Sequence, residues 1–144
     1  MKKNIKEIIY VAGVVLNQNT LKKFVNSKMP NIYCHHMTVK YGNIDKLPDF
    51  LGMKFKFISD KIFFDEKAIA AAGHVDSKFI QDMMEETNQA AHITICTAEN
   101  IKPVYSNDLL KTGSSIEYRN NVTLKFGAFC SFDDGTTGWV FKSK

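Results

Sequence analysis

Polar and apolar residues alternate along two short segments of this chain, residues 36–41 and 92–96. Each segment begins with the triplet His-x-Thr and contains β-branched residues, which is typical of strands. A strand sends successive side chains to opposite faces. The pattern therefore predicts two rows of polar side chains: His36, Thr38 and Lys40 in the first, and His92, Thr94 and Cys96 in the second.

The rest of the pattern predicts further strands and helices around these two segments. Strands are expected over residues 8–16, 54–64 (with a break at 59–60), 67–75, 116–118, 122–132 and 138–142; helices over 20–27, 78–88 and 106–110; and a loop over 42–52. Each half of the chain has a helix followed by a His-x-Thr strand, which is a weak internal repeat. The strands follow one another too closely for regular βαβ crossovers, so the order favours a two-lobed α+β fold.

The length of 144 residues and the 44% hydrophobic content are typical of one soluble domain, which we expect to span residues 1–144. The formal charge of +4 suits an anionic ligand but is too small to indicate nucleic-acid binding. Three cysteines, far apart and never in a Cys-x-x-Cys pair, favour neither disulfides nor zinc, so a reducing cytoplasm is expected. The apolar run over 8–16 is too short to span a membrane.

Two histidines that face one phosphodiester supply a complementary acid and base. A neutral imidazole takes a proton from the attacking water, and a protonated one donates to the departing alkoxide. Thr38 and Thr94 can donate hydrogen bonds to the phosphate oxygens, where charge grows in the transition state. Lys40 extends the first row with a positive charge. No carboxylates cluster beside these residues, so we expect no metal and no cofactor. The hypothesis is that both rows face one cleft and hold one phosphate.

The two motifs resemble those of the 2H phosphoesterase superfamily. The similarity is greatest to the branch that holds 2′,3′-cyclic-nucleotide 3′-phosphodiesterases, the cyclic phosphodiesterase domain of fungal-type tRNA ligases, and phage anti-CBASS phosphodiesterases. Similar stretches are residues 36–41, 91–95, 101–104 and 106–110, and less sharply 10–16 and 20–23.

This resemblance implies a bilobal α+β fold in which two antiparallel sheets flank a central cleft, with the helices outside. It implies metal-independent chemistry with His36, Thr38, His92 and Thr94 as catalytic residues. The expected substrates are cyclic oligonucleotide signals, mononucleoside cyclic phosphates or the 2′,3′-cyclic ends of RNA, acted on in the cytoplasm (a host's, if the enzyme is phage-encoded). Neither a membrane nor an obligate protein partner is expected.

Several residues allow a second interpretation. Tyr10 and Trp139 either stack on a nucleobase or are core aromatics, and Lys40 either contacts phosphate or is a solvated strand end. His35 is expected on the face opposite His36, and Cys96 in the floor of the cleft. His74 has no recognisable context.

Two other functions compete with catalysis. A binding module would sequester an RNA end or a cyclic nucleotide without turnover. A metal-binding protein would use His35, His36 and His92, although adjacent strand histidines diverge.

Overall fold

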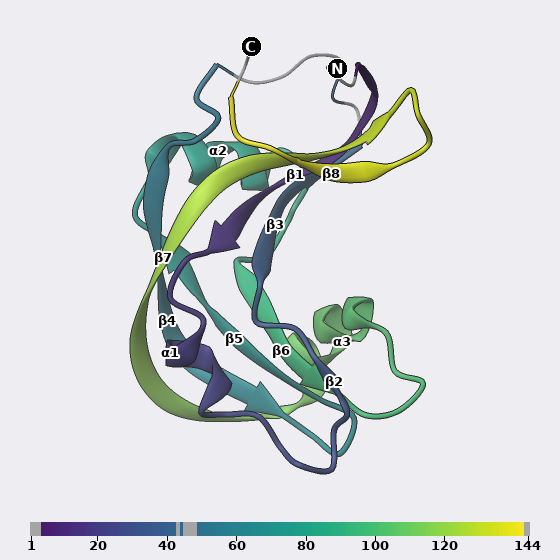
Figure 1. Ribbon diagram of the computed structural model, residues 1–144. Helices are drawn as coiled ribbons and strands as arrows, with labels where there is room; N and C mark the ends of the chain where they lie inside the picture. The colour runs from purple at the N-terminus through teal and green to yellow at the C-terminus, as the bar shows by residue number, and fades with distance from the viewer. Residues whose placement is uncertain (1–3, 43, 45–48, 143–144) are drawn as a thin grey trace.

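The computed structural model describes residues 4–42, 44 and 49–142, so residues 43 and 45–48 of the expected loop over 42–52 lie outside the described residues. Strands dominate these residues, and the few helices are short, which confirms an α+β chain built mostly of antiparallel sheet (Figure 1). The elements are β1 Ile5–Val15, α1 Asn19–Lys22, β2 Asn31–Ile32, β3 His36–Tyr41, β4 Lys54–Phe64, β5 Ala68–Val75, α2 Lys78–Glu85, β6 His92–Thr97, a 3-10 turn Pro103–Tyr105, α3 Ser106–Thr112, β7 Ser114–Phe132 and β8 Thr137–Val140.

The described strands form one hydrogen-bonded sheet in the order β2-β6-β5-β4-β7-β1-β3, with β8 beside β7. Two separate sheets were expected, and the reason for the difference is the length of two strands. β4 pairs with β7 from Lys54 to Phe64, and the 19 residues of β7 continue to pair with β1. Figure 1 shows β7 curving along the whole height of the molecule. Both halves therefore share these long strands.

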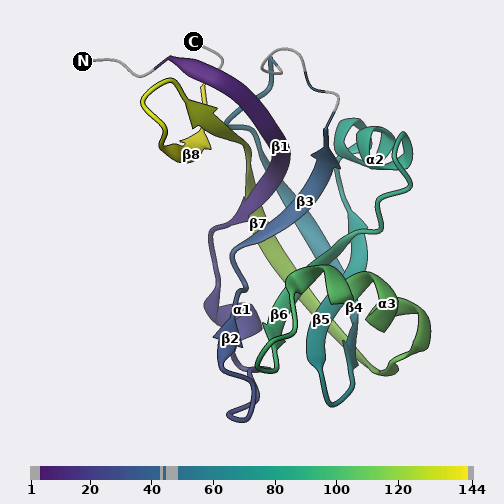
Figure 2. The same ribbon diagram turned by 90° about the vertical axis from the view of Figure 1, so that its right-hand side faces the viewer.

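The segment 31–41 joins the two edges of this sheet. Its first part, β2, pairs with β6, and the backbone N–H of Cys34 still donates to Thr94 O at 3.0 Å. One residue later the chain has changed sides: His35 O accepts from Val15 N at 2.9 Å, and β3 then pairs with β1. Cys34 lies at this crossover with a φ of 62°, a conformation that costs a non-glycine residue about 1–3 kcal/mol. The crossover brings β3 beside β6 (Figure 2).

The outer elements agree with the pattern in most places. β4 and β5 form the expected hairpin, with a register shift between Ser59 and Lys61 at the expected break. Ser77 caps α2 by accepting from Ile80 N at 3.4 Å. The expected break in the strand after residue 118 was wrong, because polar Asn120 and Asn121 stay paired with β4.

The helix expected over residues 20–27 is shorter in the structure. α1 ends at Lys22, after which Phe24 N and Val25 N bond three residues back, to Leu21 O and Lys22 O. Only Leu21 of α1 is buried, so little packing stabilises a longer helix.

A single large core lies inside the bend of the sheet. Its largest fully buried side chains include Phe57 of β4, Phe126 of β7, and Met37 and Val39 of β3. Ile93 and Ile95 of β6 belong to the same core. The apolar rows of both His-x-Thr strands are thus anchored in one core, which leaves the alternate side chains for a surface site. Over the described residues, no helix is long and apolar enough to cross a membrane.

Candidate active site

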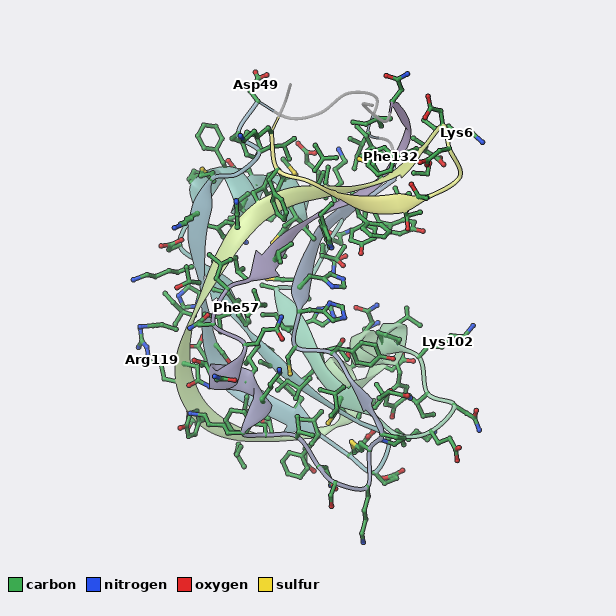
Figure 3. The ribbon with its side chains drawn as sticks, viewed as in Figure 1. Lys6, Asp49, Phe57, Lys102, Arg119 and Phe132 are labelled. Carbon is green, nitrogen blue, oxygen red and sulfur yellow. The ribbon has the colours of Figure 1, made fainter. Side chains whose placement is uncertain are left out.

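A pocket of about 390 Å³ lies where β3 and β6 separate, and all four residues of the two His-x-Thr pairs line it. The lining residues are Tyr33, His35, His36, Thr38, Tyr41, Gln89, His92, Thr94, Pro103, Val104 and Asn107. The predicted juxtaposition of the two motifs is therefore present, and the crossover at Cys34 produces it. The wall opposite β3 is the segment that leads into α3, and Figure 3 shows its exposed neighbour Lys102 extending away from the molecule.

Each His-x-Thr triplet is followed by an extra residue in its strand. On β1 the neighbours Val11 and Ala12 pair with Lys40 and Thr38, so Val39 is inserted. On β5 the neighbours Ile69 and Ala70 pair with Cys96 and Thr94, so Ile95 is inserted. Such bulges re-aim the side chains that follow and are frequent beside active sites. Both rows of polar side chains therefore end at the threonine, two residues before the Lys40 and Cys96 that strict alternation predicts as their last members.

His92 is oriented by the backbone that precedes it. Its Nδ1 lies 2.9 Å from Ala90 O, which can only accept, so Nδ1 carries the hydrogen. The other ring nitrogen, Nε2, is then free to act on a ligand. Burial lowers the pKa of His92, and the hydrogen bond to Ala90 O opposes this shift.

His36 is held by a different partner. Its Nδ1 lies within hydrogen-bonding distance of Nδ1 of His35, which also lines the pocket. Our prediction that His35 faces the other way was wrong, because β3 begins only at His36 and strand alternation does not extend back to His35. The pKa of His36 is lowered to about 4 by burial, by His35 and by His92. Without a ligand, His36 is therefore neutral near pH 7.

The two threonines differ in how their hydroxyls are held. Thr94 Oγ1 lies 2.8 Å from the hydroxyl of Ser106, which is 0% exposed, and 3.4 Å from Pro103 O. The segment after β6 thus fixes the Thr94 side chain. Among the described residues, no hydrogen-bond partner of the Thr38 hydroxyl is found within the protein. A bound anion would give this hydroxyl an acceptor.

Lys40 is displaced from the predicted row. Its ammonium forms an ion pair with Glu86 at 3.2 Å, and it does not line the pocket. The displacement of Lys40 follows from the extra residue Val39. After this bulge, Tyr41 lines the pocket, where regular alternation predicts Lys40. Cys96 shifts in the same way: it is buried in the core against Met29, and not in the floor of the cleft.

Tyr10 and Trp139 lie against His36 and outside the pocket lining. Their ring centroids are 5.6 Å and 5.9 Å from that of His36, and Trp139 meets Tyr10 edge to face. They therefore pack against the ring of His36. Sequence reasoning missed two aromatic side chains that line the pocket, Tyr33 and Tyr41, of which Tyr41 is the more exposed, at 69%. Tyr41 reaches the pocket because of the bulge at Val39, and the sequence pattern does not reveal that bulge.

The positive charge that the pocket can offer is limited to histidine, since none of its described lining residues is a lysine or an arginine. Within ranges 4–42, 44 and 49–142, no group of three or more His, Cys, Asp or Glu side chains is arranged to hold a metal ion. His74 pairs with Asp60 at 3.1 Å on the exposed surface, away from the pocket.

Comparison with known families gives one result of direct relevance. The model of the fungal tRNA ligase phosphodiesterase domain family matches residues 12–126, which is most of the chain. The chain belongs to this family. The matched span includes both His-x-Thr strands and Pro103, Val104 and Asn107, which line the pocket between them. No curated protein is similar enough to this chain to count as a match.

Membership in this family confirms the resemblance at the level of the 2H phosphoesterases. The particular branch, the roles of the four motif residues and the nature of the substrate stay predictions.

Proposed function

We propose that the protein hydrolyses 2′,3′-cyclic phosphates, with RNA ends as its substrates, by general acid–base catalysis. The observation that carries this proposal is the meeting of both His-x-Thr pairs at one pocket of about 390 Å³. Family membership supports it, because the matched family is a tRNA ligase phosphodiesterase domain. The pocket lies between the two halves of the bent sheet, which supports the two-lobed arrangement that the resemblance implies.

The reaction needs one proton to be removed and one to be supplied. Water attacks phosphorus and gives a proton to the base, the bond from phosphorus to one ribose oxygen breaks, and the acid protonates that oxygen. The product is a phosphomonoester with a free hydroxyl. His36 takes the role of base, because its pKa of about 4 keeps the ring neutral, with one nitrogen free to accept a proton. His92 is the better acid, because the bond from its Nδ1–H to Ala90 O stabilises the imidazolium.

The threonines act on the oxygens that do not react. Thr38 and Thr94 occupy equivalent positions beside their histidines, so each hydroxyl can reach a different non-bridging oxygen. Donors fixed where negative charge grows lower the barrier without further reorganisation. Thr94 can keep an interaction with the Ser106 hydroxyl while its single hydroxyl hydrogen turns from Pro103 O to a phosphate oxygen.

A second candidate substrate is a cyclic oligonucleotide signal, as for phage anti-CBASS enzymes. The exposed side chains of Tyr41 and Val104, at 69% and 68%, lie beside the pocket and offer apolar surface for a second base. Lys40, Tyr10 and Trp139 stay proposed substrate-binding residues for the larger ligand only, since they lie outside the pocket lining.

The experiment compares three substrates in the presence of EDTA: adenosine 2′,3′-cyclic phosphate, an RNA oligonucleotide with a 2′,3′-cyclic end, and a 3′,3′-linked cyclic dinucleotide. We expect EDTA-insensitive conversion of the first two to phosphomonoesters. Preference for the third would move the assignment to the cyclic oligonucleotides. Tight binding of all three without product would make the protein a binding module and contradict the proposal.

A further inference from the structure

His35 is a third histidine at the pocket, and it touches the ring of His36 directly. The two Nδ1 atoms are 2.5 Å apart, the ring centroids are 4.6 Å apart and the ring planes differ by 17°. Because the two ring planes are nearly parallel and the Nδ1 atoms are 2.5 Å apart, the distance between the planes cannot be much larger than 2.5 Å. The 4.6 Å between the centroids is therefore mostly lateral, and the rings meet edge to edge through Nδ1. The two nitrogens face each other as in an N–H···N hydrogen bond, at a distance below the usual range of about 2.7–3.2 Å for N–H donors.

One of these nitrogens must donate and the other accept. Only two forms of His36 are useful in acid–base chemistry: a neutral ring whose Nε2 is bare, and an imidazolium whose Nε2 carries a hydrogen. Nδ1 of His36 carries a hydrogen in both forms. In both forms the partner nitrogen of His35 must therefore accept.

We infer that His35 is a positioning residue, which accepts a hydrogen bond from Nδ1–H of His36 and so keeps Nε2 of His36 directed at the phosphate. This inference rests on the proposed function for its catalytic consequence, but the hydrogen bond itself is a property of the free protein. His35 takes the part for His36 that Ala90 O takes for His92.

The two supports differ in one respect. A carbonyl accepts at every pH, whereas a protonated His35 has no free nitrogen and repels a protonated His36. Burial lowers the pKa of His35, so the ring stays an acceptor near neutral pH. The other titratable groups around the pair are Tyr33 against His35, Tyr10 of β1, Tyr41 at the end of β3, and His92 across the pocket. Loss of the His36 support is therefore confined to acid conditions.

The test uses two substitutions that differ in one property. His35→Asn keeps an acceptor, the amide oxygen, whereas His35→Phe keeps an aromatic ring and removes the acceptor. On adenosine 2′,3′-cyclic phosphate we expect His35→Phe to lower kcat about 10- to 100-fold at little change in KM, a part of what acid–base catalysis is worth. His35→Asn should keep kcat within severalfold. His74→Phe is the matched control, because His74 is exposed and outside the pocket.

Rate profiles against pH supply a readout that a merely structural role would not change. His35 lowers the pKa of His36, so its replacement by neutral Asn should raise that pKa and move the acid limb of kcat/KM to higher pH. An unchanged limb together with full activity of His35→Phe would overturn the inference. Equal losses in both variants through a raised KM would also overturn it, because His35 would then bind the substrate itself.

A spectroscopic measurement separates failure of this inference from failure of the proposed function. Two-bond ¹H–¹⁵N spectra of the free protein report which ring nitrogen of each histidine carries the hydrogen. We expect His36 as the Nδ1–H form in the wild type and in His35→Asn, and a shift toward the Nε2–H form in folded His35→Phe. A wild-type His36 in the Nε2–H form would contradict the positioning role even if the enzyme is active. An inactive wild type with the expected form would contradict the function alone.

Discussion

The two halves of the pocket carry the same motif but support it in different ways. In β6 a backbone carbonyl, Ala90 O, holds the ring of His92, while the Ser106 hydroxyl and Pro103 O hold the hydroxyl of Thr94. In β3 side chains hold the ring of His36: His35 contacts its Nδ1, and Tyr10 and Trp139 pack against it. The carbonyl that holds His92 accepts at every pH, whereas the imidazole that holds His36 stops accepting once it is protonated.

The difference follows from the position of each strand in the sheet. β6 is paired on both sides, with β5 along its length and with β2 at its far end. β3 is paired with β1 alone and begins one residue after the crossover segment. Both strands begin at their histidine, and the residue that holds the ring precedes the strand in each case: Ala90 through its carbonyl and His35 through its side chain.

The largest expected effect comes from removal of either imidazole. His36→Ala and His92→Ala should each lower kcat on adenosine 2′,3′-cyclic phosphate by about 10³-fold, within the range of a lost acid or base. The double variant should be little worse than either single one, because the two act as a unit. A single variant that retains more than a tenth of wild-type activity would contradict the equivalence of the two halves. His74→Ala is the control.

The dependence on pH tests both histidines together. In the free protein His36 must be neutral, a condition lost as pH falls through about 4. His92 must be protonated, a condition lost as pH rises through a pKa that burial holds below 6.5. Thus kcat/KM should follow a bell whose maximum lies on the acid side of pH 6.5, with about tenfold loss per unit beyond each limb. The kcat profile should lie at higher pH, because a bound phosphate anion raises both pKa values. A profile without an acid limb would exclude the paired roles.

Removal of the Thr38 and Thr94 hydroxyls should reduce activity in both variants but reduce stability in only one of them. Thr38→Ala and Thr94→Ala should each lower kcat about 10- to 100-fold, since each removes one donor to the phosphate. Thr94→Ala should also lower the free energy of unfolding by about 1–3 kcal/mol, because the buried hydroxyl of Ser106 loses its partner. Urea unfolding of both variants measures this. Equal stabilities would show that the Ser106 contact contributes nothing.

The smallest expected effect is a change of KM on substitution of Tyr41 or Lys40, because the bulge at Val39 brings Tyr41 to the pocket in place of Lys40. Tyr41→Ala should raise KM for an RNA end about tenfold, since stacking of a base on an aromatic ring is worth about 1–3 kcal/mol. Lys40→Ala should change KM less than twofold, because its ammonium pairs with Glu86 at 3.2 Å. Steady-state kinetics at fixed salt compares them. The opposite ranking would place Lys40 in contact with phosphate and restore the regular row.

Much of the site was predictable because period-two alternation is a local property. The alternation put His36 and Thr38 on one face and His92 and Thr94 on one face, and the apolar residues between them are buried in the core. Their meeting at one pocket depended on topology, which alternation does not determine; it was a hypothesis based on the paired chemistry of the two rows, and the family resemblance also implied it.

The predictions that were wrong concern features that depend on pairing between strands distant in the sequence. The inserted residues Val39 and Ile95 are apolar and β-branched, so they look like any other inward residue of a strand. The bulges moved Lys40 and Cys96 out of the pocket and brought Tyr41 to it. His35 was misplaced because the strand begins at His36, a boundary that the crossover at Cys34 sets and the local sequence does not. The single sheet in place of two reflects the lengths of β4 and β7, whose polar middle hid their continuity.

Binding of product tests most directly whether both halves hold one phosphate. Adenosine 2′-monophosphate and 3′-monophosphate are titrated in turn into protein labelled with ¹⁵N at its histidine rings, and the signals of His36 and His92 are followed. Both rings should respond to the same nucleotide with one dissociation constant, and the pKa of each should rise when the phosphate is bound. If only one ring responds, or if the two respond with different dissociation constants, the motifs do not share a phosphate and the proposed chemistry is contradicted.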